Sequence, residues 1–135
     1  MRILTIREAL QLAELVTGVS ADVLANYSRI DSLDSALHAP FIGFGNVQVY
    51  KSFELQAAVL CSRIVRNHPL PDGNKRLGWV ALLMFCDLNC YDISFEPSQV
   101  IALFVMIASS EVPENEIADW LSRHLSFREL SGART

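Results

Sequence analysis

The sequence has no apolar run long enough to cross a membrane. Its longest uncharged apolar runs are residues 77–86 and 100–108, well short of the roughly 20 apolar residues that a transmembrane helix needs. Two charged side chains, Arg7 and Glu8, appear before any apolar stretch can develop at the N-terminus, so a secretory signal is not expected. These absences predict a cytoplasmic protein without a membrane-spanning segment.

Cysteine is scarce, and its pattern argues against a metal centre. The three cysteines, Cys61, Cys86 and Cys90, are an odd number, form no Cys-x-x-Cys pair and sit in apolar, helix-like sequence. We expect reduced thiols buried in the core. His68 has no second histidine or cysteine at ligand spacing, which disfavours a zinc site. The glycine-rich signatures of the common nucleotide-binding loops are also absent.

Positive charge is in deficit. The chain has 11 lysines and arginines against 15 aspartates and glutamates, a formal net charge of -4, so general binding to nucleic acid is not expected. With 135 residues, of which 51% are hydrophobic, the chain can bury one core, and no internal repeat, linker or low-complexity tract divides it. We expect a single domain over residues 1–135.

Helical patterns fill most of the chain. Thr5 and Glu8 have the spacing of a capping box, and Gly18 is placed to close the helix that follows. Residues 53–67 and 77–88 are apolar over much of their circumference, which is typical of helices buried in a bundle. Further helices are expected at residues 31–38, at 96–109 and from 113 to a packed Leu125, with a weaker segment at 22–27 and fraying from Phe127 onward. The pattern predicts an all-α fold.

Residues 41–50 interrupt this helical pattern. The segment is rich in glycine, aromatic and β-branched residues, and Gly45-Asn46 is typical of a hairpin turn. We therefore expect a small extended flap before the helix at residues 53–67. The flap is either a plain connector or a strand edge that holds a protein substrate in extended form.

The chain is organised around a polar loop between two apolar helices. From residue 68 it reads His-Pro-Leu-Pro-Asp-Gly-Asn-Lys-Arg, and the two prolines and the glycine prevent a continuous helix. If Asn74 begins the second helix, the unpaired N–H groups of that first turn form an anion site. Lys75 and Arg76 add full positive charge at the same place. A phosphate group is the expected occupant.

The same loop holds a base and an acid. His68 can accept a proton near neutral pH, at the end of a buried helix that would fix its orientation. Asp72 can hold a Mg²⁺ ion that bridges phosphate oxygens, because Mg²⁺ needs only one or two protein carboxylates. Gly73 lets the backbone approach a ligand. On composition alone, a simple Pro-Asp-Gly turn with its charges in solvent is an equal alternative.

The nine residues from His68 to Arg76 closely resemble the signature of the Fic/Doc family, His-x-Phe-x-Asp/Glu-Gly/Ala-Asn-Gly/Lys-Arg, and in particular its death-on-curing (Doc) branch. The helix before Pro40, Tyr50, Asn67 and the final Trp-Leu pair also look like that branch. The resemblance implies a compact all-α Fic/Doc-type helical bundle with a small flap before the central helix. It also implies transfer of part of ATP, with Mg²⁺, to a hydroxyl of a protein target.

The resemblance implies a role for each residue of the loop. His68 would be the general base for the target hydroxyl, and Asp72 would position Mg²⁺ or the substrate. The residues implied in nucleotide and phosphate binding are Arg66, Gly73, Asn74, Lys75 and Arg76. The flap residues implied in target docking are Phe41, Ile42, Gly43, Phe44, Val47 and Tyr50.

The chain differs from AMP-transferring Fic proteins at two positions. Those proteins usually carry glycine where this chain has Lys75 and a second arginine where it has Trp79. Both differences favour a kinase-type toxin of the Doc kind, whose relatives phosphorylate elongation factor Tu, over a protein adenylylating enzyme. The implied partners are such a protein substrate, with a Ser or Thr hydroxyl as acceptor, and a Phd-like antitoxin that binds as a helix against the bundle.

Two further departures leave a third reading open. Leu70 stands where the family normally has phenylalanine, and Leu77 stands where it has threonine. A smaller loop anchor is compatible with a degenerate antitoxin-binding module that lacks activity. Residues 110–115 also fit the Ser/Thr-x-x-x-Glu-Gly/Asn inhibitory pattern of some Fic proteins. Pro113 breaks helix there and the arginine partner is missing, so we interpret this match as chance.

Overall fold

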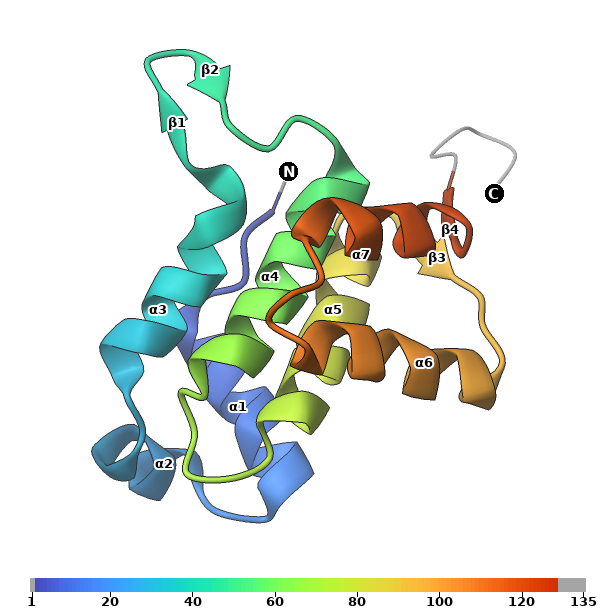
Figure 1. The fold of residues 1–135 in the computed structure, drawn as a ribbon. Helices are drawn as coiled ribbons and strands as arrows, with labels where there is room; N and C mark the ends of the chain where they lie inside the picture. Colours follow the sequence, from blue (N-terminus) through green and yellow to red (C-terminus); the bar gives the residue numbers. More distant parts are fainter. Residues whose placement is uncertain (1, 129–135) are drawn as a thin grey trace, which may run out of the picture.

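The computed structural model describes residues 2–128 as a helical bundle with two pairs of short strands (Figure 1). The helices are α1 (Ile6–Thr17), α2 (Ala21–Tyr27), α3 (Ile30–His38), α4 (Phe53–Asn67), α5 (Asn74–Leu88), α6 (Pro97–Ala108) and α7 (Glu114–Ser122), with a 3₁₀ helix η1 (Ala39–Phe41) after α3. The strands are β1 (Gly43–Phe44), β2 (Val47–Gln48), β3 (Tyr91–Ile93) and β4 (Leu125–Phe127). The predicted all-α bundle with one small flap is confirmed.

Helix α4 lies at the centre of the bundle. Ser52 caps its start by accepting a hydrogen bond from the Leu55 N–H at 3.1 Å. Ten of its 15 residues are buried, which explains why the sequence is apolar around most of the helix. Helices α3, α5, α6 and α7 all pack against it. The residues that follow its C-terminal end are therefore attached to the most buried element of the fold.

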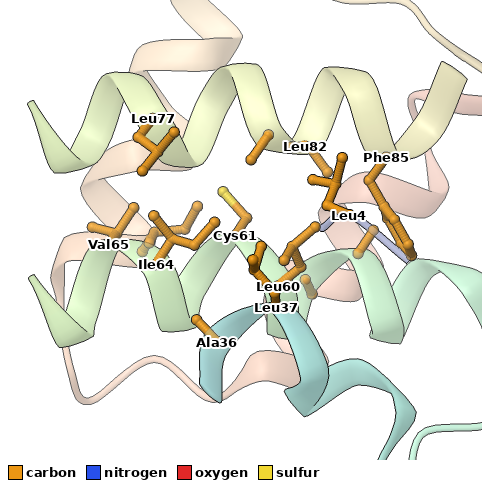
Figure 2. Packing of buried hydrophobic residues seen from close by; sticks show 14 of the residues in the cluster. Leu4, Ala36, Leu37, Leu60, Cys61, Ile64, Val65, Leu77, Leu82 and Phe85 are labelled. Carbon is orange, nitrogen blue, oxygen red and sulfur yellow. The ribbon is translucent and has the colours of Figure 1, made fainter. Parts of the chain in front are cut away.

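Helix α5 runs back alongside α4, and the two helices share the core (Figure 2). Leu77, Leu82 and Phe85 of α5 point toward α4, where Cys61 and Ile64 fill the space between the two helices. Each of these five side chains is at most 1% exposed. Burial of this much apolar surface supplies most of the driving force for the pairing. The pair holds both ends of the connecting loop.

One glycine allows the two helices to approach closely. A Cβ atom on Gly78 would lie 2.7 Å from Val65 Cγ2 and 3.4 Å from the Cys61 carbonyl oxygen. The first distance is shorter than real side chains tolerate, so α5 can pack this closely on α4 only without a side chain at residue 78.

Helix α1 begins and ends as its sequence predicts. The Thr5 hydroxyl accepts from the Glu8 N–H at 3.1 Å, and the Glu8 carboxylate accepts from the Thr5 N–H at 3.0 Å. That backbone hydrogen bond lowers the pKa of Glu8 below its usual value. Gly18 closes the helix in the left-handed conformation, at φ 74°. The capping signals therefore fix both ends of this helix.

The predicted flap is an antiparallel hairpin. Gly43 pairs with Gln48 and Phe44 pairs with Val47, with Gly45 at φ 60° in the turn between them. In Figure 1 the hairpin extends beyond the N-terminal end of α4, on the far side of the bundle from the α4–α5 loop.

The C-terminal part of the structure differs from the prediction. Helix α7 ends at Ser122, and Leu125 is in strand β4, where it pairs with Ile93 of β3. Phe127, which we expected to fray, pairs with Tyr91; residues 129–135 lie outside the described part of the chain. A strand of three residues has too little alternation to be recognised. Its paired residues in β3 lie 32 to 36 positions away in the sequence, so no local turn signal marks the pairing either.

The cysteines are free thiols, and two of the three are buried as predicted. Burial raises the pKa of Cys86 to about 12 and raises the pKa of Cys61 well above its usual value. Cys90 differs from the prediction, because it lies half-buried after the end of α5 in a left-handed conformation with φ 67°. Over residues 2–128, no helix has the length and apolar character needed to span a membrane.

We expect Gly78→Ala to lower the free energy of unfolding, although alanine is the better helix former by about 1 kcal/mol. The added methyl group would meet the stiff Val65 side chain, and overpacking of this kind costs about 1–3 kcal/mol. Chemical denaturation of both proteins measures the difference. In a Val65→Ala background the same substitution should cost less, because the opposing methyl group is gone. An equal cost in the two backgrounds would contradict the close-approach argument.

Candidate active site

The loop between α4 and α5 forms a polar cavity of about 520 Å³. Six of the seven residues that the sequence implied in catalysis or in phosphate binding line it, together with Pro71; they are His68, Asp72, Gly73, Asn74, Lys75 and Arg76. The seventh, Arg66, is not among the lining residues. The fold therefore gathers the predicted base, acid and cations around one space.

His68 is exposed and follows the last residue of α4. Its backbone is left-handed, with φ 48° and ψ 57°, a conformation that costs a non-glycine residue about 1–2 kcal/mol. Within residues 2–128 its ring nitrogens have no hydrogen-bond partner, so the imidazole is free to meet a ligand. The strained backbone turns the chain away from the helix axis at the residue that carries the predicted base.

Arg29, which the sequence analysis did not identify, contacts the backbone around His68. Its guanidinium donates to the carbonyl oxygens of Asn67 and His68, the latter at 2.8 Å. Its main-chain N–H donates to the Pro69 carbonyl at 2.8 Å. These partners lie 38 to 40 residues away in the sequence, and nothing in the local pattern around Arg29 indicates them. Only the packing of the α2–α3 corner against the loop brings them together.

Leu70 anchors the middle of the loop in the core. Its side chain is 4% exposed and belongs to the main buried cluster, so leucine fills the anchoring role of the phenylalanine usual in the family signature. Pro69 beside it is also buried. Burying a leucine contributes about 1.5–3 kcal/mol relative to leaving it exposed. The loop is therefore tied down between its two polar ends.

Asn74 shapes the loop through its side chain. Its Oδ1 accepts from the Leu70 N–H at 2.9 Å, and its Nδ2 donates to the Leu70 carbonyl at 3.0 Å. Both polar atoms of its side-chain amide thus bond the loop. The predicted contact of Asn74 with phosphate would therefore come from backbone N–H groups in the first turn of α5. Gly73 precedes that turn at φ 87°, where a Cβ atom would lie 2.9 Å from Thr17 Cγ2. Both the backbone angle and the contact with α1 require glycine here.

The charges around the cavity are predominantly positive. Lys75 and Arg76 are exposed in the first turn of α5, and Asp72 is exposed in the loop before it. None of the three forms an ion pair with another residue of the described chain. The N-terminal end of a 15-residue helix adds partial positive charge at the same place. The arrangement favours an anion at the start of α5.

The comparison with protein families agrees with this geometry. The model of the Fic/DOC family matches residues 4–86, which include the flap, α4, the loop and most of α5. The chain belongs to the Fic/DOC family.

One curated relative matches part of the chain. The chain is 39% identical over 57 residues to a protein named Toxin Doc from Mycolicibacterium smegmatis. The aligned segment covers 42% of this chain and 44% of that relative, so the chain matches less than half the length of the relative. No solved structure matches the chain significantly.

Arg66, implied in phosphate binding by the Fic/Doc resemblance, has a different set of partners. Its guanidinium donates to the carbonyl oxygens of Ile107, Ser109 and Val112 at 2.7–2.9 Å. These three bonds hold the connection between α6 and α7 against the last turn of α4. Since its Nε and Nη2 donors are engaged there and it does not line the cavity, we leave Arg66 out of the proposed site.

The Fic/DOC flap is not part of the loop cavity either. The hairpin precedes α4 and the loop follows it, and a helix of 15 residues is about 22 Å long. No flap residue lines the cavity. Buried Gln56 ties the flap to α4 by donating to the Tyr50 carbonyl at 3.1 Å. Target docking by the flap stays a prediction, and it requires a target large enough to reach from one end of α4 to the other.

Residues 110–115, which match an inhibitory Fic motif in sequence, have a structural role between α7 and α4. Pro113 precedes α7, so the segment is not a continuous helix. Glu114, the glutamate of the pattern, accepts hydrogen bonds from the Ser62 hydroxyl at 2.5 Å and from Arg63 Nε at 3.0 Å. The bond to Glu114 raises the pKa of Arg63. This carboxylate joins α7 to α4 and does not line the loop cavity.

We expect Asn74→Ala to weaken the fold by about 1–3 kcal/mol, because both main-chain groups of Leu70 lose their partner. Asn74→Asp should not restore stability, since it sets a carboxylate oxygen against the Leu70 carbonyl. Urea denaturation measures both effects. Asn115→Ala is the matched control, because Asn115 is exposed on α7. Equal unfolding free energies for Asn74→Ala and Asn115→Ala would contradict the role of Asn74 in the loop.

Proposed function

We propose that residues 1–135 form one Fic/Doc-like domain that acts as a Doc-type toxin. In this proposal the protein transfers the γ-phosphate of ATP to a Ser or Thr hydroxyl of a protein target. The observation that carries it is the single cavity in which an exposed histidine faces an acidic residue, two cations and the start of a helix. Membership of the Fic/DOC family and the partial match to a protein named Toxin Doc support the same assignment.

The start of α5 is suited to hold the phosphate that is transferred. The first N–H groups of a helix have no partners inside it, and Asn74, Lys75 and Arg76 of this first turn line the cavity. Lys75 and Arg76 extend from the same turn and neutralise the charge of the triphosphate. Gly73, left-handed at φ 87°, makes the turn from the loop into this helix start. Because these groups are fixed by α5, they would be in place before the nucleotide binds.

Asp72 is the residue suited to hold Mg²⁺. It is exposed, it has no ion-pair partner in residues 2–128, and it lines the cavity beside the cations. The described residues contain no cluster of three His, Cys, Asp or Glu side chains, which fits an ion that takes most of its ligands from phosphate oxygens and water. When bound, Mg²⁺ would neutralise the charge on the phosphate oxygens.

His68 acts as the general base in this proposal. It takes the proton of the target hydroxyl while that oxygen forms a bond to the γ-phosphorus. The bond from the γ-phosphorus to the bridging oxygen breaks, and ADP leaves with that oxygen. The imidazole is suited to this step because it lines the cavity with both nitrogens free of partners in the described chain.

The surroundings of Trp79 favour phosphate transfer over AMP transfer. Trp79 packs edge-to-face against Phe95 and Phe104, with ring centroids 4.8 and 6.0 Å away. It also lines an apolar cavity of about 390 Å³ that opens beside Lys75 and Arg76. AMP-transferring Fic proteins usually have an arginine at this position. An apolar wall here does not supply that second phosphate contact, so transfer of the γ-phosphate fits this site better than transfer of AMP.

The protein target would dock at a surface away from the loop cavity. Elongation factor Tu is the candidate that the resemblance to Doc toxins implies. The flap has exposed apolar side chains, with Phe44 81% and Val47 61% exposed, and main-chain groups on the open edges of a two-stranded sheet. It would therefore bind part of the target distant from the modified hydroxyl.

An antitoxin segment would bind the apolar groove between α5 and α6. Two adjoining cavities share Lys75, Val100 and Phe104, and the groove continues to Ile101 and Val105, each 67% exposed. An amphipathic helix with an acidic residue near Lys75 fits this surface. Its binding would cover the cation that the triphosphate needs, which is how a Phd-like antitoxin would inhibit the enzyme.

We expect His68→Ala to lower transfer about a hundredfold to ten-thousandfold, the usual contribution of a general base. The assay incubates the protein with Mg²⁺, elongation factor Tu or bacterial lysate, and ATP labelled on the α- or the γ-phosphate. Label from γ only, lost in His68→Ala, supports the kinase. His38→Ala is the matched control, because His38 is an exposed histidine on α3 that contacts Asp34. Unchanged transfer in His68→Ala would overturn the assignment.

The other outcomes of this assay identify the alternatives. Label from the α-phosphate would mean protein adenylylation in spite of Lys75. No label from either position, combined with no nucleotide-dependent rise in melting temperature, would mean a degenerate antitoxin-binding module. A rise in melting temperature without transfer would instead mean that the nucleotide binds and the target is missing.

We expect the double substitution Ile101→Asp and Val105→Asp to weaken antitoxin binding at least tenfold without changing transfer. Both side chains are exposed, so two added carboxylates disturb the groove and leave the core intact. Calorimetry with a Phd-like antitoxin measures the affinity. Val47→Asp on the flap is the matched control, since it adds charge to another exposed apolar residue. If only Val47→Asp lost affinity, the antitoxin would bind the flap and not the groove.

A further inference from the structure

Arg29 contacts three successive carbonyl oxygens at the end of α4. Its Nη2 atom donates to the carbonyls of Asn67 and His68, and its main-chain N–H donates to the carbonyl of Pro69. Carbonyls at the end of a helix have no partner within the helix and need one from elsewhere. One residue from a distant corner of the chain supplies all three.

The backbone that Arg29 holds is in a conformation that it would not adopt by itself. The backbone of His68 is left-handed, with φ 48° and ψ 57°, a conformation that residues other than glycine rarely adopt. In addition, a residue that precedes a proline prefers extended backbone, and Pro69 follows His68. Two independent preferences therefore oppose the observed conformation of His68, and contacts with the rest of the chain offset them.

Arg29 is itself fixed in place, so it can act as an anchor. It lies between two helices. At the end of α2, the Ser28 N–H donates to the Leu24 carbonyl at 2.8 Å; at the start of α3, the Leu33 N–H donates to the Arg29 carbonyl at 3.0 Å. Leu24 and Leu33 are both buried. The α2–α3 corner is thus held by the core on both sides of Arg29.

We propose that Arg29 is a positioning residue for His68. By bonding the carbonyls of Asn67 and His68, the guanidinium keeps His68 left-handed, and this backbone angle decides whether the imidazole faces the loop cavity. Arg29 does not line that cavity, so it acts on the reaction through His68 alone. The effect on catalysis rests on the proposed function, whereas the effect on the backbone does not.

The test compares Arg29→Ala and Arg29→Lys with the unchanged protein. Arg29→Ala removes the guanidinium and keeps the main-chain bond to Pro69. We expect kcat for γ-phosphate transfer to fall about tenfold to a hundredfold, the usual cost of misplacing a reacting group by about 1 Å. KM for ATP should change less than about twofold, because the phosphate site on α5 is untouched. Arg29→Lys should recover little activity, because an ammonium group lacks the planar array of donors of guanidinium.

Chemical rescue separates positioning from loss of fold. Millimolar guanidinium ion should restore part of the activity of Arg29→Ala and none of that of His68→Ala. Arg7→Ala, which removes another exposed arginine, should leave kcat unchanged. A kcat for Arg29→Ala equal to that of the unchanged protein would overturn the proposal. A loss carried entirely by KM for ATP would do the same.

An experiment without turnover keeps this proposal distinct from the proposed function. The three-bond HN–Hα coupling of His68, measured by NMR, depends on its φ angle. In Arg29→Ala we expect it to shift toward the extended value that Pro69 favours, while couplings within α4 stay helical. An unchanged coupling would overturn the proposal even if transfer were observed. If Arg29→Ala does not fold, Arg29→Lys, which keeps a cation at this position, provides the same readout.

Discussion

The anchoring of Leu70 between α4 and α5 is the contact on which the candidate site depends. The loop consists of polar and conformationally restricted residues, and loops of this kind are normally held in shape by what lies beneath them. Here a buried leucine fixes the middle of the loop, and Asn74 holds the Leu70 backbone from the first turn of α5. The charged residues can then remain exposed, because apolar contacts maintain the shape of the loop.

The close packing of α4 on α5 extends this effect to the whole site. Gly78 allows the two helices to approach, so the ends that carry His68 and Lys75 keep a fixed separation. Binding groups on helix ends are better preorganised than groups on free loops. Two arginines complete the support at the end of α4: Arg29 holds the loop side, and Arg66 holds the α6–α7 connection. Neither of them lines the cavity.

The structure also separates two features that the family resemblance placed in one function. The flap and the loop lie at opposite ends of α4 (Figure 1). Apolar grooves beside Lys75, in contrast, adjoin the loop cavity, which Lys75 also lines. A protein that covers these grooves would compete with the nucleotide for the same cation, whereas a protein bound to the flap would leave the cavity open. Control of activity and docking of a large target can therefore use different surfaces.

The sequence by itself determined the helices with strong end signals and the chemistry of the loop. Capping residues, prolines and glycines act within a few residues of their own position, so Thr5, Gly18 and residues 68–76 could be interpreted locally. Three other features could not be interpreted locally, because each joins segments more than 30 residues apart. They are the pairing of β3 with β4, the hydrogen bonds from Arg29 to the end of α4, and those from Arg66 to the α6–α7 connection. Whether such segments meet depends on how the whole core packs. The residue types of the site were thus determined by sequence, whereas the tertiary structure decided which of them reach the cavity and what holds them there.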